Sequence, residues 1–174
     1  DSLVAKLDTA PWLTALSTGP GRWCLDARAP WARLDATAEV RDLKAESAGA
    51  ERRVDLAVQG PRSKEILLRL ADSPADRRRM AALLRNDFAA VRLAGLSMLV
   101  SRTGYTGEPV AYECYVHPDA AARLWNAVLE AGRPRGLVPC GLGSRDSTRT
   151  EAGLPLYGHE LAGKLGISPA GAGY

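Results

Sequence analysis

The chain has 174 residues, of which 46% are hydrophobic and 25% are charged, the balance of an ordinary globular domain. A chain of this length buries roughly 70% of the surface that its unfolded form exposes, so intrinsic disorder and collagen-like repeats are excluded. The 23 basic and 20 acidic residues leave a formal charge of +3, too small an excess to indicate nucleic-acid binding by itself.

The N-terminal part of the chain is the most difficult to assign. Residues 1–36 contain several tryptophans among glycines and prolines, and we interpret them as a short helix followed by irregular chain. Segment 37–43 is a candidate strand. Alternating apolar and polar residues over 54–59 predict a clearer strand, which ends at Gly60-Pro61.

Two short helices are predicted to follow that strand. Pro61 suits the first position of a helix, so the first helix is expected to begin there. Its apolar stripe consists of Ile66, Leu67 and Leu70. Ser73 and Pro74 predict the start of the second helix, as a cap followed by a first-turn proline. Its inner face is expected to hold Met80, Leu83 and Leu84.

A β-hairpin is predicted next, because apolar residues alternate with others over 91–93 and 96–100 on either side of Ala94-Gly95. After a polar, glycine-containing stretch at 101–108, a further strand is predicted over 110–116. Alternation places one set of side chains on its apolar face, namely Val110, Tyr112, Cys114 and Val116. Glu113 therefore lies in mid-strand on the opposite face.

Two longer helices complete the pattern. The first is predicted to begin at Pro118-Asp119 and to end at Gly132, which would supply a left-handed stop. Its apolar stripe consists of Leu124, Trp125, Val128 and Leu129. The second helix is expected between residues 141 and 153, where Arg145 and Arg149 stand four apart on one face.

This order of elements predicts an α+β domain, an antiparallel sheet with helices on one face and with ferredoxin-like elements. Three parts of the chain are distinguished. They are a poorly assigned lead-in at 1–36, an α+β domain at 37–140, and a helix with a return segment at 141–174.

The loop 101–108 is a candidate binding element. Gly104 and Gly107 allow its backbone to approach a ligand closely or to adopt positive φ, and Tyr105 and Thr106 between them offer an aromatic face and hydroxyl groups. A hairpin connection without function is the alternative.

Glu113 is the most specific single candidate. A carboxylate in an otherwise apolar strand must face water, pair with a cation, or meet N–H donors of a ligand. A planar ligand with adjacent N–H and NH2 groups would suit it as a bidentate partner. A solvated outer face is the alternative.

Other chemistries have little support. Arg145 and Arg149 either clamp an anion or pair with Asp146 and Glu151 on a solvated helix face. His159 is a weak candidate for a general base. Two histidines and three scattered cysteines match no metal-ligand spacing, so no metal site is predicted. The glycine patterns of phosphate sites and the GxSxG elbow of serine hydrolases are absent as well.

The cysteines also bear on the cellular environment. Cys24, Cys114 and Cys140 form no CxxC pair and no even-numbered framework, which favours a reducing cytoplasm.

No apolar run approaches the roughly 20 residues that span a bilayer, and the start shows no signal peptide, so no membrane association is expected. The chain opens without an initiator Met, and we expect it to be a piece of a longer protein.

Three stretches, taken in order and spacing, resemble the T-protein of the glycine cleavage system, a family of tetrahydrofolate-dependent aminomethyltransferases. They are LAVQGP at 56–61, SRTGYTGE at 101–108 and GLGSRDSTRTEAGLPLYGHEL at 141–161. The resemblance runs from about residue 40 to the end of the chain. Residues before that position show no clear correspondence.

The resemblance implies a reaction in which the aminomethyl group on the lipoyl arm of the H-protein loses ammonia and leaves its one-carbon unit on tetrahydrofolate. Tetrahydrofolate is therefore the expected cofactor and the lipoylated H-protein the expected partner, with neither nucleic acid nor membrane involved. The family pattern assigns the pterin contact to Glu113, a folate contact to Arg145 and a lining position to Tyr105. It gives no role to Arg149, Tyr157 or His159.

The chain departs from the family pattern in two ways. One extra residue separates the loop from Glu113, which a bulge would absorb. Family members run to about twice this length, and neither their GG-x-x-DD segment with its catalytic aspartate nor their C-terminal β-barrel is found here. The catalytic residue is thus unknown, and the chain is expected to be the middle of an aminomethyltransferase that is inactive alone.

Three alternatives remain open at this point. One is a related tetrahydrofolate-dependent demethylase, and another is a non-catalytic folate-binding module, although the KGCYxGQ signature of such modules is absent. The third is nucleic-acid binding through Arg77, Arg78 and Arg79, in the segment that holds most of the excess positive charge.

Overall fold

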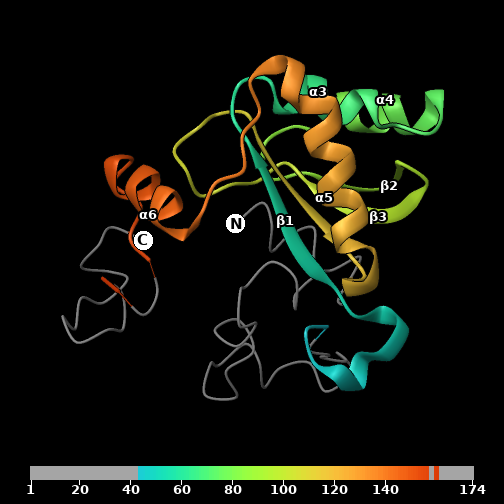
Figure 1. Cartoon of the computed structure of the whole chain (residues 1–174), viewed down its shortest axis with the longest axis horizontal. Helices are drawn as coiled ribbons and strands as arrows, with labels where there is room; N and C mark the ends of the chain where they lie inside the picture. The colour runs from blue at the N-terminus through green and yellow to red at the C-terminus, as the bar shows by residue number, and fades with distance from the viewer. Residues whose placement is uncertain (1–42, 157–158, 161–174) are drawn as a thin grey trace, which may run out of the picture.

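The computed structural model describes residues 43–156 and 159–160 (Figure 1). The helix predicted within 1–36 and most of the strand predicted over 37–43 lie outside the described residues. Leu43 itself lies in a turn and is buried.

The centre of the fold is a four-stranded antiparallel sheet in the order β1-β4-β3-β2. Its strands are β1 (Val54–Gln59), β2 (Phe88–Leu93), β3 (Leu96–Ser101) and β4 (Ala111–Val116). The first strand in sequence forms one edge and pairs with the last, so that Ala57 lies opposite Glu113. Residues more than fifty positions apart are thereby brought side by side.

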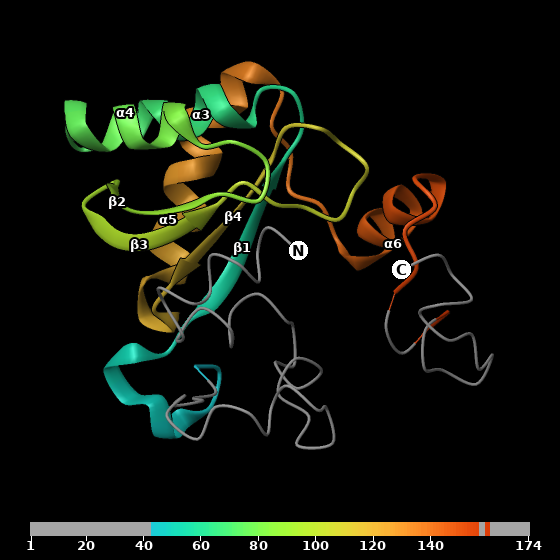
Figure 2. The same cartoon turned by 180° about the vertical axis from the view of Figure 1, so that it is seen from behind.

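Three helices cover one face of this sheet (Figures 1 and 2), namely α3 (Ser63–Arg69), α4 (Pro74–Ala82) and α5 (Pro118–Gly132). Two short 3-10 helices, η3 (Glu46–Glu51) and η4 (Arg133–Arg135), precede β1 and follow α5. Helix α6 (Leu142–Glu151) stands apart from the other helices, on the side toward which the loop between β3 and β4 extends. The predicted α+β class, with helices on one face, is confirmed.

The alternation predicted for β4 is confirmed by the core. Tyr112, Cys114 and Val116 point into the main cluster under the helices and are at most 1% exposed. Tyr115 points to the opposite face, where it packs with Leu43 and Leu99. Glu113 shares that second face, so the apolar core does not enclose its carboxylate.

The hairpin and the cap of α4 also agree with the sequence. Ala94 and Gly95 form the two-residue turn with φ values of 52° and 74°, the positive pair that twisted hairpins favour. Ser73 caps α4, because its hydroxyl accepts the Asp76 N–H at 3.0 Å.

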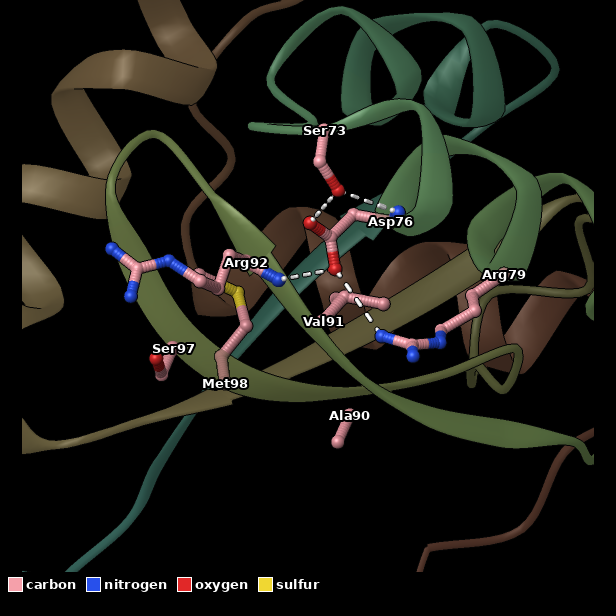
Figure 3. A pocket seen from close by; sticks show the side chains of 8 residues that line it. All are labelled: Ser73, Asp76, Arg79, Ala90, Val91, Arg92, Ser97 and Met98. Carbon is pink, nitrogen blue, oxygen red and sulfur yellow. Dashed lines mark hydrogen bonds and ion pairs between the residues drawn. The ribbon is translucent and has the colours of Figure 1, made fainter.

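The Asp76 side chain links α4 to the edge strand β2 by a hydrogen bond (Figure 3). Its carboxylate accepts the Ser73 hydroxyl at 2.5 Å and the backbone N–H of Arg92 at 3.2 Å, and both bonds lower its pKa. The carboxylate borders a cavity of about 360 Å³. Because protein donors already occupy both of its oxygens, we read this cavity as part of the helix-to-sheet junction.

Two predicted helix positions are wrong. Helix α3 begins at Ser63, because Gly60 turns the chain at φ 116° and leaves Pro61 in that turn. Leu84 is 67% exposed because α4 ends at Ala82 and the backbone leaves the helical conformation at Leu83. The helical period therefore does not extend to Leu84.

Helix α5 ends at Gly132 as predicted, but the left-handed conformation predicted for Gly132 is wrong. Its φ is −94°, and the left-handed residue is Gly136, at φ 76° after η4. Gly132 is instead a site of close packing, since a Cβ there would lie 2.4 Å from the Leu137 side chain. Its missing side chain lets segment 137–141 run back along α5.

Candidate functional site

A pocket of about 720 Å³ lies where β1, the loop 101–108, segment 137–140 and α6 meet. Glu113, Tyr105 and Arg145 all line it, so the structure brings together the three residues that the sequence singled out. They come from a strand, a loop and a helix. The volume falls within the range of roughly 300 to 1,000 Å³ that is usual for small-molecule sites.

Hydroxyl groups hold the carboxylate of Glu113. Thr103 Oγ1 donates to its Oε2, and the Tyr115 hydroxyl lies 3.4 Å from the same oxygen. Ser101 Oγ, 2.6 Å from Thr103 Oγ1, extends the network. Among the described residues no ion pair includes Glu113, so its charge is held by neutral donors beside an open pocket.

The loop 101–108 is wedged between the sheet and the end of α6. A Cβ on Gly104 would lie 2.4 Å from the Cβ of Ala111, and one on Gly107 would lie 2.4 Å from the Cβ of Ala152. Gly107 also has a φ of 80°. The predicted positive φ is confirmed at Gly107, and the surface that both glycines approach closely is the protein itself.

Tyr105 bridges this loop to the segment after α6. Its hydroxyl donates to the Pro155 carbonyl, while its half-buried ring lines the pocket. The neighbouring Thr106 donates to Gln59 Oε1 at 3.2 Å, and Gln59 Nε2 donates to the Tyr112 carbonyl at 3.1 Å. The loop is thus tied to β1 on one side and to segment 154–156 on the other.

Arg145 and Arg149 do not form a clamp. Arg145 is exposed on the pocket side of α6, and among the described residues no hydrogen bond or ion pair holds its guanidinium. Arg149 is 4% exposed and pairs with Asp146 and Glu160. The expected pairing with Asp146 is confirmed, but the second acidic partner is Glu160 and not Glu151.

Arg149 organises the segment that follows α6. Its guanidinium also donates to the Leu154 carbonyl at 3.3 Å, and Glu160 accepts the Leu156 N–H at 2.9 Å. The hydrogen bond from Arg149 lowers the pKa of Glu160 to about 2, and the bond from Leu156 adds to this. Residues 154–156 and Glu160 are thereby fixed against α6. His159 is exposed and does not line the pocket.

Asp55 is a pocket residue that the sequence did not single out. It lies on β1 on the same face as Glu113, and its carboxyl is within hydrogen-bonding reach of the Glu113 carboxyl. Desolvation by the surrounding protein atoms, together with the Glu113 charge, raises the pKa of Asp55 to about 7. Part of the Asp55 residue nevertheless remains exposed to solvent. The sequence likewise assigned no individual role to the residues whose hydroxyls form the network on Glu113, namely Ser101, Thr103 and Tyr115.

Gly107→Ala is expected to lower the free energy of unfolding by about 1 to 3 kcal/mol, because the new methyl group meets Ala152 and the positive φ disfavours a side chain. Urea unfolding followed by circular dichroism measures this change. Gly143→Ala is the matched control, because its Cβ would meet nothing within 4 Å. Equal stability of the two variants would contradict the close contact between the loop and α6.

Two negative findings concern the described residues only. They contain no group of three or more His, Cys, Asp or Glu side chains arranged to hold a metal ion. Within the same ranges, no helix has both the length and the apolar character needed to cross a membrane.

Comparisons with known proteins give consistent results. The family model described as GCVT N-terminal domain matches residues 1–174. A protein of Streptomyces avermitilis named aminomethyltransferase is 49% identical over 118 residues, which are 68% of this chain and 30% of the relative. Proteins of the same name are 40% identical over 173 residues in Streptomyces coelicolor and 42% identical over 142 residues in Geobacillus kaustophilus.

The extent of these matches adds two facts. The Streptomyces coelicolor relative covers 99% of the chain, so the similarity includes the lead-in at 1–36, where the motifs had shown no clear correspondence. The chain covers 43% of that relative and 36% of the Geobacillus relative, and therefore spans less than half the length of these curated proteins.

Proposed function

The chain belongs to the GCVT N-terminal domain family, and from this premise we propose that it is part of a tetrahydrofolate-dependent aminomethyltransferase of the glycine cleavage system. The whole protein would take the aminomethyl group from the lipoyl arm of the H-protein, release ammonia and leave the one-carbon unit on tetrahydrofolate. The observation that carries the proposal is that Glu113, Tyr105 and Arg145 line one pocket.

The chemistry of the pocket suits a reduced folate. Glu113, held by the hydroxyls of Thr103 and Tyr115, offers carboxylate oxygens that can accept the adjacent N–H and NH2 groups of a pterin. The ring of Tyr105 offers an aromatic face, and the guanidinium of Arg145, which no other described residue pairs with, offers donors to a folate oxygen. Tetrahydrofolate supplies the nitrogen atoms that accept the one-carbon unit.

The proposed site draws on both of the later parts of the chain. Glu113 and Tyr105 belong to 37–140, whereas Arg145 lies on α6 in 141–174. No residue is assigned as the catalytic acid or base, because no GG-x-x-DD segment occurs among the 174 residues. We therefore propose that these 174 residues bind folate but do not catalyse the transfer when isolated. We also propose that the complete protein acts in the cytoplasm.

A transfer assay with the full-length protein tests this function. With tetrahydrofolate and aminomethyl-lipoyl H-protein, we expect ammonia release that depends on both substrates and on the protein. Turnover only with a methylated donor would favour a folate-dependent demethylase. Folate binding without turnover of any donor would favour a non-catalytic folate-binding module.

A further inference from the structure

Two carboxyl groups meet on the open face of the sheet. In the antiparallel pairing of β1 with β4, Asp55 lies opposite Tyr115 and Ala57 lies opposite Glu113, so Asp55 and Glu113 are diagonal neighbours on one face. Their side chains are within hydrogen-bonding reach of each other, and both line the pocket. A hydrogen bond between two carboxyl groups requires that one of them carries a proton.

The surroundings indicate that Asp55 carries this proton. Glu113 Oε2 already accepts hydrogen bonds from the hydroxyls of Thr103 and Tyr115, so this oxygen is placed to accept. Among the described residues, Glu113 is the only hydrogen-bonding partner of the Asp55 carboxyl. The proton therefore belongs on Asp55, whose carboxyl accepts no hydrogen bond from any other described residue.

The charged and titratable groups around Asp55 act in both directions. Glu113 and Tyr115 face it from β4, Arg145 faces it from α6, and Lys44 lies in the turn before η3. The two cations favour ionisation of Asp55, but desolvation and the Glu113 charge outweigh them and raise its pKa to about 7. Burial raises the pKa of Tyr115 above its usual range, so that its hydroxyl stays protonated near neutral pH.

We propose that Asp55 is a positioning residue that donates the single proton of the pair to Glu113 and so holds the Glu113 carboxylate as one anion facing the bound folate. This inference rests on the proposed function of the pocket. When the pH rises through about 7, Asp55 loses its proton, and a second negative charge stands beside Glu113 in place of the hydrogen bond. Folate affinity should then fall.

The test is a pH series of calorimetric titrations of the full-length protein with 5-formyltetrahydrofolate, a stable reduced folate. The wild type is expected to lose about tenfold in affinity between pH 6 and pH 8.5, the size of one hydrogen bond. Asp55→Asn keeps a neutral donor and should keep the affinity of the wild type at pH 6 across the series. Asp55→Ala should bind weakly throughout.

Asp119→Asn is the matched control, because Asp119 lies on α5 outside the pocket with a 91% exposed side chain. It should retain the pH slope of the wild type. The same slope in Asp55→Asn would overturn the positioning role and leave the folate site intact, whereas absence of folate binding by the wild type would overturn both.

A measurement without folate provides a second test. The carboxyl carbon of Asp55, followed by NMR in the ligand-free protein, is expected to titrate near pH 7. Titration near 4, the ordinary value for an aspartate, would overturn the shared proton even if a variant failed to fold.

Discussion

Glu113→Gln is expected to weaken binding of a reduced folate by about 10- to 100-fold. The carboxylate accepts charge-assisted hydrogen bonds from two adjacent donors, whereas the amide presents an NH2 group to one of them. Losing such a bond costs about 1 to 3 kcal/mol. The half-buried side chain lines the pocket, so the substitution should change the free energy of unfolding of the protein little.

Calorimetric titration at pH 6.5 measures this effect, and Glu108→Gln is its matched control. Glu108 lines the same pocket, but it lies on the loop, and among the described residues it accepts only the Val110 N–H, at 3.4 Å. It should lose less than about threefold in affinity. An equal loss in both variants would mean that the net charge of the pocket, and not the placement of Glu113, determines binding.

Arg149→Ala is expected to cause the largest loss of stability among the helix α6 variants. The substitution removes at once the partner of Asp146 and Glu160 and the donor to the Leu154 carbonyl. Residues 154–156 and Glu160 should then detach from α6 and release the Pro155 carbonyl from Tyr105. Hydrogen exchange measures this as lost protection at Leu154 and Leu156, together with a lower urea midpoint.

Arg145→Ala separates placement of the helix from ligand binding. Arg145 is exposed, so its removal should leave the urea midpoint unchanged while lowering folate affinity by about tenfold or more. Arg149→Ala should lower both quantities. If Arg149→Ala kept wild-type protection at Leu154 and Leu156, the anchoring role of Arg149 would be wrong.

The stability effect of Arg149→Ala should depend on pH in a defined direction. Because the folded-state pKa of Glu160 is lowered to about 2 from an ordinary 4.5, the pair with Arg149 contributes fully above pH 4.5 and is lost as the pH falls toward 2. The difference between variant and wild type should therefore be the same at pH 6 and pH 8. The pair of Arg149 with Glu160 therefore adds no pH dependence to stability in the range where Asp55 titrates.

Local patterns in the sequence predicted much of the site. Alternation over 110–116 placed Glu113 in mid-strand away from the apolar core. The two glycines of the loop indicated positive φ or a close approach to a ligand, and Gly107 does have a positive φ. Ser73 and Pro74 marked the start of α4 correctly. Each of these features depends on residues within a few positions of one another, where steric and hydrogen-bonding preferences act directly.

Contacts between distant segments were not predictable in the same way. Asp55 reaches Glu113 only because β1 pairs with β4, which the alternation within either strand does not specify. Arg149 was expected on the same face as Arg145, but residues 154–156 and Glu160 return to bury Arg149, whereas no other described residue pairs with the Arg145 guanidinium. Gly132 ends α5 as expected, but it was mistaken for a left-handed residue, because its true constraint is the Leu137 side chain that packs against it.

A crystal structure of the full-length protein with bound 5-formyltetrahydrofolate tests the central claim most directly. We expect the pterin edge to donate its N–H and NH2 groups to the Glu113 carboxylate, with the Tyr105 ring in contact and Arg145 directed at the ligand. A folate bound elsewhere, or one in the pocket with Glu113 turned away from it, would contradict the proposed site.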